Sequence, residues 1–286
     1  MKIVFWSPVH GQTRQSSNLL AVSLNLAMEQ HKKILVTQTQ YRMNDLEDAV
    51  VGRVGKKEFR DRFYQDMGID SLIRCLKRKR IEKADIENCC VQLLTDEEFV
   101  LLPGSQCGNY EIFQETVGEA VHTVLEEAEK YYDFVFIDTN PGGDRISRQL
   151  LQIADLIVIN LSQNVGVIDR FFWDYPKELR GKKVFFLFGS YLADSCYNLS
   201  NLRYRYGMIR RSNAAVIPMN VGFMDAIASG NVRNYFAKNL ECEVGDANYV
   251  FMQEVEEAVR KMTTYIAKKS SAFANKKGGV HEYCID

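Results

Sequence analysis

A run of eight residues near the N-terminus, Ser7–Arg14, has the glycine and hydroxyl spacing of a loop that binds phosphate. In the pattern G-x-x-x-x-G-K-[ST], glycines let the backbone approach the ligand, the lysine contacts the outer phosphates and the hydroxyl holds magnesium. Gly11 and Thr13 fit this pattern, but Gln12 stands where the lysine would be. The run therefore predicts a phosphate-binding loop that has lost its main cation. The alternative is that a Gly-x-Thr turn starts an ordinary capped helix.

The segments around this run predict one βαβ unit. Residues 2–6 are a short apolar run typical of a strand, and the next apolar run, residues 34–36, follows a cationic break. Between the two runs, apolar side chains recur on one helical face, at Leu20, Leu24, Ala27 and Met28. The first loop of such a unit lies at the carboxyl end of the sheet, where backbone N–H groups and the helix dipole favour an anion.

Further segments follow in the order and spacing of one family. The chain resembles the MinD/ParA ATPases with a deviant phosphate loop, whose pattern K-G-G-x-G-K-T-T falls on Ser7–Arg14 and whose N-L falls on Asn18-Leu19. Residues 132–141 are the strongest local match, to the family's strand that ends in Asp-Thr-x-Pro. Residues 101–105, 154–159 and 216–230 resemble later segments of the family. The resemblance covers roughly residues 1–268.

The resemblance implies an α/β fold, namely a single-domain, three-layer P-loop NTPase-like fold with a mostly parallel central sheet flanked by helices. This domain is expected to span residues 1–268, and residues 269–286 to form a polar, mobile C-terminal tail. The resemblance also implies a homodimer that binds ATP or ADP with magnesium. The nucleotide-binding residues that it implies are His10, Gly11, Gln12, Thr13, Arg14, Gly189 and Pro218, and the metal-binding residues are Thr13 and Asp138.

The departures from the family pattern fall on charged residues. Ser7 and Gln12 replace its two lysines, and Gln38 and Gln40 replace the two acids of its D-x-D segment. One cation about 4 Å from a phosphate is worth roughly 4 kcal/mol at an effective dielectric of about 20, and about 1.4 kcal/mol is tenfold in rate. We therefore expect ATP hydrolysis to be very slow or absent, and no catalytic residue is assigned.

Neighbouring residues could compensate for part of the lost charge. Arg14 and His10 flank the loop and could approach a phosphate; otherwise Arg14 is a solvated residue of the first helical turn. Asp138 could hold magnesium through water, because that ion keeps several waters; otherwise it caps the turn after its strand. Where the family often carries an adenine-reading asparagine, this chain has Gly189-Ser190, which leaves the base preference open.

Composition limits the class of protein. A chain of 286 residues with 46% apolar content is long enough for one large α/β domain. A net charge of -1 gives no global attraction to DNA or to an anionic membrane, so any such contact would be local. The seven cysteines include no C-x-x-C pair, which argues against zinc and iron–sulfur sites. With no membrane-spanning apolar stretch and no signal-peptide pattern, a cytoplasmic location is expected.

Two surface patches are candidates for partner binding. The densest basic run, residues 74–83, is most simply a solvated face, with binding of DNA phosphates or of an acidic partner as the alternative. Residues 197–211 mix arginine with tyrosine, as protein interfaces and single-strand-binding surfaces do. A helix that packs its tyrosines on the sheet is the simpler interpretation of this second patch.

These observations favour a MinD/ParA-like positioning or scaffold factor that acts as a dimer with a protein partner and hydrolyses ATP weakly or not at all. The subgroup that the chain resembles most is the TadZ-like localisation proteins of tight-adherence pili, which implies a role in pilus assembly or secretion. The alternative is an active ATPase of the partition type that acts on DNA or membrane. An amidase or ligase would need a nucleophile or an acid/base pair, and the sequence contains no recognisable one.

Overall fold

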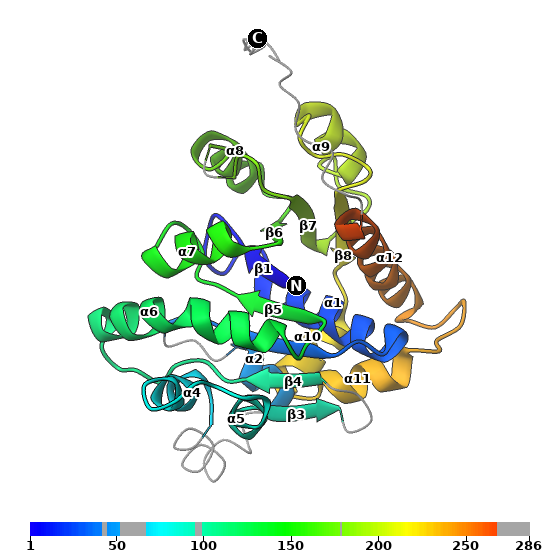
Figure 1. The fold of residues 1–286 in the computed structure, drawn as a ribbon. Coiled ribbons are helices and arrows are strands. Elements are labelled where there is room, and N and C mark those ends of the chain that lie inside the picture. The colour runs from blue at the N-terminus through cyan, green and yellow to red at the C-terminus, as the bar shows by residue number, and fades with distance from the viewer. Residues whose placement is uncertain (42–44, 52–66, 95–98, 178, 268–286) are drawn as a thin grey trace.

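The computed structural model describes residues 1–41, 45–51, 67–94, 99–177 and 179–267. Its centre is an eight-stranded sheet with the strand order β3-β4-β2-β5-β1-β6-β7-β8 (Figure 1). Neighbouring strands run parallel except β3, which pairs antiparallel with β4 at one edge. The strands are β1 (Lys2–Trp6), β2 (Ile34–Gln38), β3 (Val91–Leu94), β4 (Phe99–Leu102), β5 (Phe134–Asp138), β6 (Leu156–Leu161), β7 (Val184–Tyr191) and β8 (Ala214–Pro218).

Helices cover both faces of this sheet and bury a hydrophobic core on each side. One core is shared by α4 (Ile69–Leu76), α5 (Lys83–Cys89), α6 (Tyr110–Glu129), α7 (Arg145–Ile153), α8 (Val165–Asp174) and α9 (Leu199–Arg205). The other is shared by α1 (Gln15–Gln30), α2 (Asp45–Val51), α10 (Val221–Ser229), α11 (Val232–Asn239) and α12 (Tyr249–Ala267). The predicted three-layer α/β class with a mostly parallel sheet is therefore confirmed.

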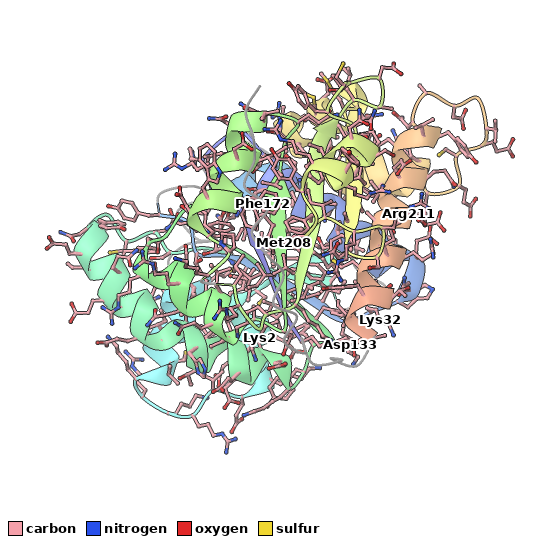
Figure 2. The ribbon with its side chains drawn as sticks, turned by 90° about the horizontal axis from the view of Figure 1, so that it is seen from above. Lys2, Lys32, Asp133, Phe172, Met208 and Arg211 are labelled. Atoms are coloured by element: carbon pink, nitrogen blue, oxygen red, sulfur yellow. The ribbon has the colours of Figure 1, made fainter. Side chains whose placement is uncertain are left out.

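The central strand β1 illustrates why the sheet needs helices on both faces. Successive side chains of a strand point to opposite faces, so Ile3 and Phe5 enter one core while Val4 and Trp6 enter the other. All four are fully buried, as expected for a parallel strand that is covered on both sides. Figure 2 shows side chains filling the space on both sides of the sheet, with Lys2 and Asp133 at the edge where β1 and β5 begin.

A side-chain cap begins several helices, but the helix at the predicted phosphate loop has none, and neither have α4 and α11. Side chains accept a hydrogen bond from a first-turn N–H at the starts of α6, α7, α8, α9 and α10, through Asn109, Asp144, Asn164, Asn198 and Asn220. Helix α1 starts instead after Arg14, which has a left-handed conformation (φ 56°) and makes no side-chain cap. The alternative of an ordinary capped helix start is therefore wrong for this loop.

The basic run, residues 74–83, is largely paired with nearby polar groups. Lys79 contacts Asp85, Lys83 contacts Glu87 and Arg80 lies 3.9 Å from Glu127. Such exposed pairs contribute little to stability, but they reduce the free positive charge that a nucleic acid would need. The described part of this run therefore fits a solvated face.

The second patch, residues 197–211, is divided between core and surface. Tyr206 is buried and stacks on Phe172 of α8 with ring centroids 4.6 Å apart, whereas Tyr204 is 96% exposed. Figure 2 places Phe172, Met208 and Arg211 in this part of the molecule.

In the described chain no helix is both long and apolar enough to cross a membrane. The predicted tail, residues 269–286, lies outside the described residues.

Candidate functional site

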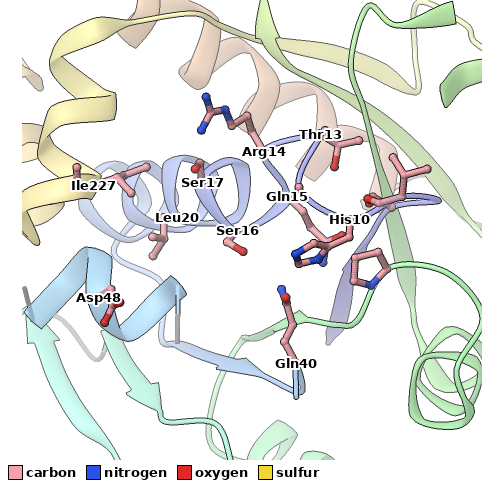
Figure 3. Close-up of a pocket in the computed structure, with 15 residues that line it drawn as sticks. His10, Thr13, Arg14, Gln15, Ser16, Ser17, Leu20, Gln40, Asp48 and Ile227 are labelled. Carbon is pink, nitrogen blue, oxygen red and sulfur yellow. The ribbon is translucent and has the colours of Figure 1, made fainter. Parts of the chain in front are cut away.

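The loop between β1 and α1, residues 7–14, lies at the carboxyl edge of the sheet and borders a cavity of about 310 Å³ (Figure 3). Gln40 after β2, Asp48 of α2 and Pro141 after β5 complete its walls together with α10. Four of the predicted binding residues line it: His10, Gly11, Thr13 and Arg14. The cavity is therefore where the βαβ argument places an anion, at the switch between β1 and its two neighbours.

The N-terminus of α1 gives this cavity a positive potential. Because Arg14 makes no side-chain cap, the first N–H groups of α1 keep their capacity to donate, and the first turn contains no acidic residue. The helix dipole adds a partial positive charge at the same end. His10 and Arg14 are both exposed at the cavity. An anion is the ligand that this end of the helix favours.

Asp138 is the buried anchor beneath the loop. It is 0% exposed at the end of β5, and three side chains donate hydrogen bonds to its carboxylate. Gln15 Nε2 lies 2.5 Å from Oδ1, while Ser16 Oγ and Gln40 Nε2 lie 2.6 and 2.8 Å from Oδ2. Gln15 Nε2 also donates to the Thr139 carbonyl at 2.6 Å. The network ties the start of α1 to the ends of β5 and β2.

The hydroxyl that contacts Asp138 is not the one that the sequence prediction placed there. It belongs to Ser16, and the residue before it is Gln15. Two residues of the loop have the left-handed conformation that favours glycine, Gly11 (φ 73°) and Arg14 (φ 56°). Both Gly11-Gln12-Thr13 and Arg14-Gln15-Ser16 therefore have the left-handed residue and the hydroxyl at the spacing of G-K-[ST], and the second of them contacts Asp138.

Thr13 and Gln12, which the sequence prediction placed at the hydroxyl and lysine positions of the loop, are not among the described residues whose side chains donate to Asp138. Thr13 is 1% exposed, and its carbonyl accepts a hydrogen bond from Asn18 Nδ2 at 3.2 Å. Gln12 is exposed, does not line the cavity, and its Oε1 lies 3.5 Å from Asn164 Nδ2. Ser16 carries no signal that the sequence prediction used, and its contact with Asp138 is seen only in the structure.

Gly189 and Pro218, predicted to contact a nucleotide, have different positions. A Cβ atom on Gly189 would lie 2.7 Å from both Asn18 Nδ2 and the Thr13 carbonyl, so this glycine lets β7 pack against the loop. It lines neither cavity, whereas the next residue, Ser190, lines a second one of about 300 Å³ together with Pro218. The two cavities share Arg14, Ser17, Ile227 and Ala228 in their walls and therefore adjoin at the start of α1.

Gln38, the last residue of β2, and Gln40, two residues later, each donate to a buried carboxylate. Gln40 donates to Asp138, and Gln38 Nε2 donates to Glu47, a residue of α2 that is 1% exposed. Glu47 also accepts from the Gly104 backbone N–H at 2.8 Å. An amide at each of these positions gives the buried carboxylate a hydrogen-bond donor. Glu47 could not be predicted, because its partners lie elsewhere in the chain and it carries no local signal.

The arrangement fits an anion better than a divalent cation. Magnesium needs oxygen ligands, and both oxygens of Asp138 face N–H or O–H donors. Within the described ranges, no group of three His, Cys, Asp or Glu side chains could hold a metal ion. Phosphate oxygens, in contrast, fit the open N–H groups of α1 and the two exposed basic side chains beside them.

Comparison with known proteins gives a match in structure but none in sequence. No protein-family model and no curated protein sequence matches this chain. A ParA family ATPase from Chlorobium tepidum TLS superposes with a TM-score of 0.68 at 14% identity, over 90% of this chain and 98% of that one.

Two MinD structures are also similar. MinD from Pyrococcus horikoshii OT3, in complex with Mg-ADP, gives a TM-score of 0.64 at 14% identity over 94% of this chain and 100% of that one. MinD in the MinC:MinD complex of Aquifex aeolicus gives 0.63 at 14% identity over 92% and 95%. At such identities the match establishes the architecture alone. The chain has the P-loop NTPase fold of the ParA and MinD ATPases.

Proposed function

We propose that this protein is a MinD/ParA-like factor that binds ATP or ADP at the start of α1, hydrolyses ATP weakly or not at all, and acts as a dimeric positioning or scaffold factor. The observation that carries the proposal is the orientation of Gln15. In the proposed register, which takes Arg14-Gln15-Ser16 as G-K-[ST], this residue holds the lysine position of the loop, yet its amide donates to Asp138 and to the Thr139 carbonyl rather than into the cavity.

The proposed role of the loop is to hold phosphates by backbone donors. The open N–H groups of α1 would contact the phosphate oxygens, with Arg14 as a flanking cation and His10 as a flanking imidazole. The sugar and base would occupy the adjoining cavity beside Pro218 and Phe223. When ATP is the ligand, its terminal phosphoryl group would be the group open to hydrolysis.

Weak hydrolysis follows from the charges that face this cavity. No lysine is among the described residues that line it. A missing cation costs roughly 4 kcal/mol of transition-state stabilisation at an effective dielectric of about 20, which is about three orders of magnitude in rate. Binding without turnover is still useful, because a ligand held by the folded state stabilises that state.

A matched pair of lysine variants tests this proposal. Gln15→Lys restores a cation at the proposed position, and Gln12→Lys makes the same change three residues earlier, at an exposed site outside the cavity. We expect titration calorimetry to show tighter ATP binding for Gln15→Lys only. Tighter binding by Gln12→Lys alone would refute the proposed register. No ATP or ADP binding by the wild type or either variant would refute the nucleotide site.

The second candidate is an active ATPase of the partition type that acts on DNA or membrane. It is favoured by one observation, the exposed Arg14 side chain in the walls of both cavities, which could replace the missing lysine. Under this alternative, Arg14→Ala abolishes a measurable ATP turnover. Under the scaffold proposal, turnover by the wild type is already weak or absent, and Arg14→Ala changes it little.

Dimerisation with a protein partner belongs to the same proposal. MinD of Aquifex aeolicus is found in complex with MinC, which supports a partner-binding role for a chain of this fold. A place in pilus assembly is the narrower form of the proposal and rests on the sequence resemblance. Light scattering during size-exclusion chromatography, with and without ATP, tests the dimer. A monomer in both conditions would refute it.

A further inference from the structure

We infer that this site binds its nucleoside phosphate as a free anion, without a divalent cation. The inference rests on the proposed function and names the form of ligand that the site accepts. It also separates this chain from the Pyrococcus horikoshii MinD, which was obtained with Mg-ADP. The carrying observation is that each oxygen of the Asp138 carboxylate accepts an N–H of a buried amide, from Gln15 at Oδ1 and from Gln40 at Oδ2, and amide N–H groups repel a cation.

The Gln15 amide can present only its N–H groups to Asp138. Its Nε2 bonds two acceptors at once, Asp138 Oδ1 and the Thr139 carbonyl, so a flipped amide would bring its oxygen against two other oxygens. The side chain is 7% exposed and therefore has little room to swing away. Gln40, at 4% exposed, covers the other carboxylate oxygen in the same way. A cation at Asp138 would have to displace both amides.

Other acids do not gather into a replacement site. Glu47 is buried and accepts hydrogen bonds from Gln38 and from the Gly104 N–H. Asp48 lines the cavity from α2, but Figure 3 shows it well apart from Gln40. Magnesium requires near-octahedral oxygen coordination, usually with one or two carboxylates beside the phosphates. Among the described residues that line the cavity, Asp48 is the only acid.

The primary test measures ADP binding to the wild-type protein by titration calorimetry, in excess EDTA and in excess MgCl₂. We expect ADP to bind at least as tightly in EDTA, because magnesium sequesters the free anion that the site accepts. Binding that weakens about tenfold or more in EDTA would overturn the inference and leave the proposed nucleotide site intact. Binding in neither buffer would overturn both.

A second test uses magnesium alone and needs no nucleotide. Gln40→Glu places a second carboxylate within hydrogen-bond distance of Asp138, which creates a cation site at the cost of charge repulsion. We expect this variant to have a lower Tm that MgCl₂ raises, and the wild-type Tm to be unaffected by MgCl₂. Gln12→Glu, at the exposed position of the same loop, is the matched control and should not respond.

The wild-type measurement decides the question even where Gln40→Glu fails to fold. A wild-type Tm that rises with MgCl₂, and does not rise with an equal ionic strength of NaCl, would overturn the inference. An unchanged wild-type Tm together with tight ADP binding in EDTA supports it.

Discussion

Replacing Asp138 with alanine should destabilise the protein strongly, because the carboxylate holds three elements together. Its removal leaves the donors of Gln15, Ser16 and Gln40 without their acceptor in a site that is 0% exposed. A buried donor without a partner costs about 1–3 kcal/mol. Because the three donors share one site and are not independent, the expected loss is about 3–5 kcal/mol rather than the full sum.

Urea denaturation followed by circular dichroism measures this loss as a shift of the midpoint at constant m-value. Asp144→Ala is the matched control, since Asp144 caps α7 by accepting from the Ser147 N–H at 3.1 Å. Loss of such a cap costs about 1 kcal/mol.

The sign of the Asp138→Ala effect distinguishes two roles for the carboxylate. An aspartate that is kept free to bind a metal is held at a cost in stability, so its replacement is neutral or stabilising in the absence of metal. An aspartate that serves as a structural acceptor is costly to remove. A loss below about 1 kcal/mol would refute the reasoning that Asp138 is satisfied by its three donors.

Three further predictions concern other residues. At Arg14, the strain of a left-handed backbone on a residue with a Cβ atom exceeds the chain entropy that a glycine would lose on folding. Arg14→Gly should therefore raise the free energy of unfolding by about 0.5–1 kcal/mol in urea denaturation, and a decrease would contradict this. Gly189→Ala should destabilise by about 2–3 kcal/mol, since its Cβ would lie 2.7 Å from its neighbours, while Gly207→Ala, in open space, serves as the control. Burial raises the pKa of the Cys89 thiol to about 11, so at pH 8 a thiol reagent should label the exposed Cys196 long before Cys89; equal rates would contradict this.

The fold could be predicted because its signals are local and repeated. The run of residues 2–6 is predicted and observed as a strand, and the helical face at Leu20, Leu24, Ala27 and Met28 belongs to an observed helix, Gln15–Gln30. Buried parallel strands have a strong apolar signal, and their order follows from the family resemblance. Helix ends are less certain because fraying and caps depend on neighbouring residues.

The site was only partly predictable because one of the two left-handed residues of the loop, Arg14, is not a glycine; the other is Gly11. Glycine normally marks such a position in a sequence, and Arg14 carries no such mark. The prediction used Gly11 as the reference and placed the hydroxyl at Thr13, whereas the hydroxyl that contacts Asp138 is that of Ser16. The partners of Asp138 and Glu47 could not be read from the sequence either, since they are set by strand register and by contacts between distant segments.

The proposed function requires that the start of α1 holds a nucleotide that the protein hydrolyses weakly or not at all. ATP binding and phosphate release are best recorded on one wild-type sample, with and without magnesium. We expect saturable binding at one ATP per chain and phosphate release at or close to the buffer rate. Repeated turnover at each bound site, or the absence of any ATP and ADP binding, would contradict it.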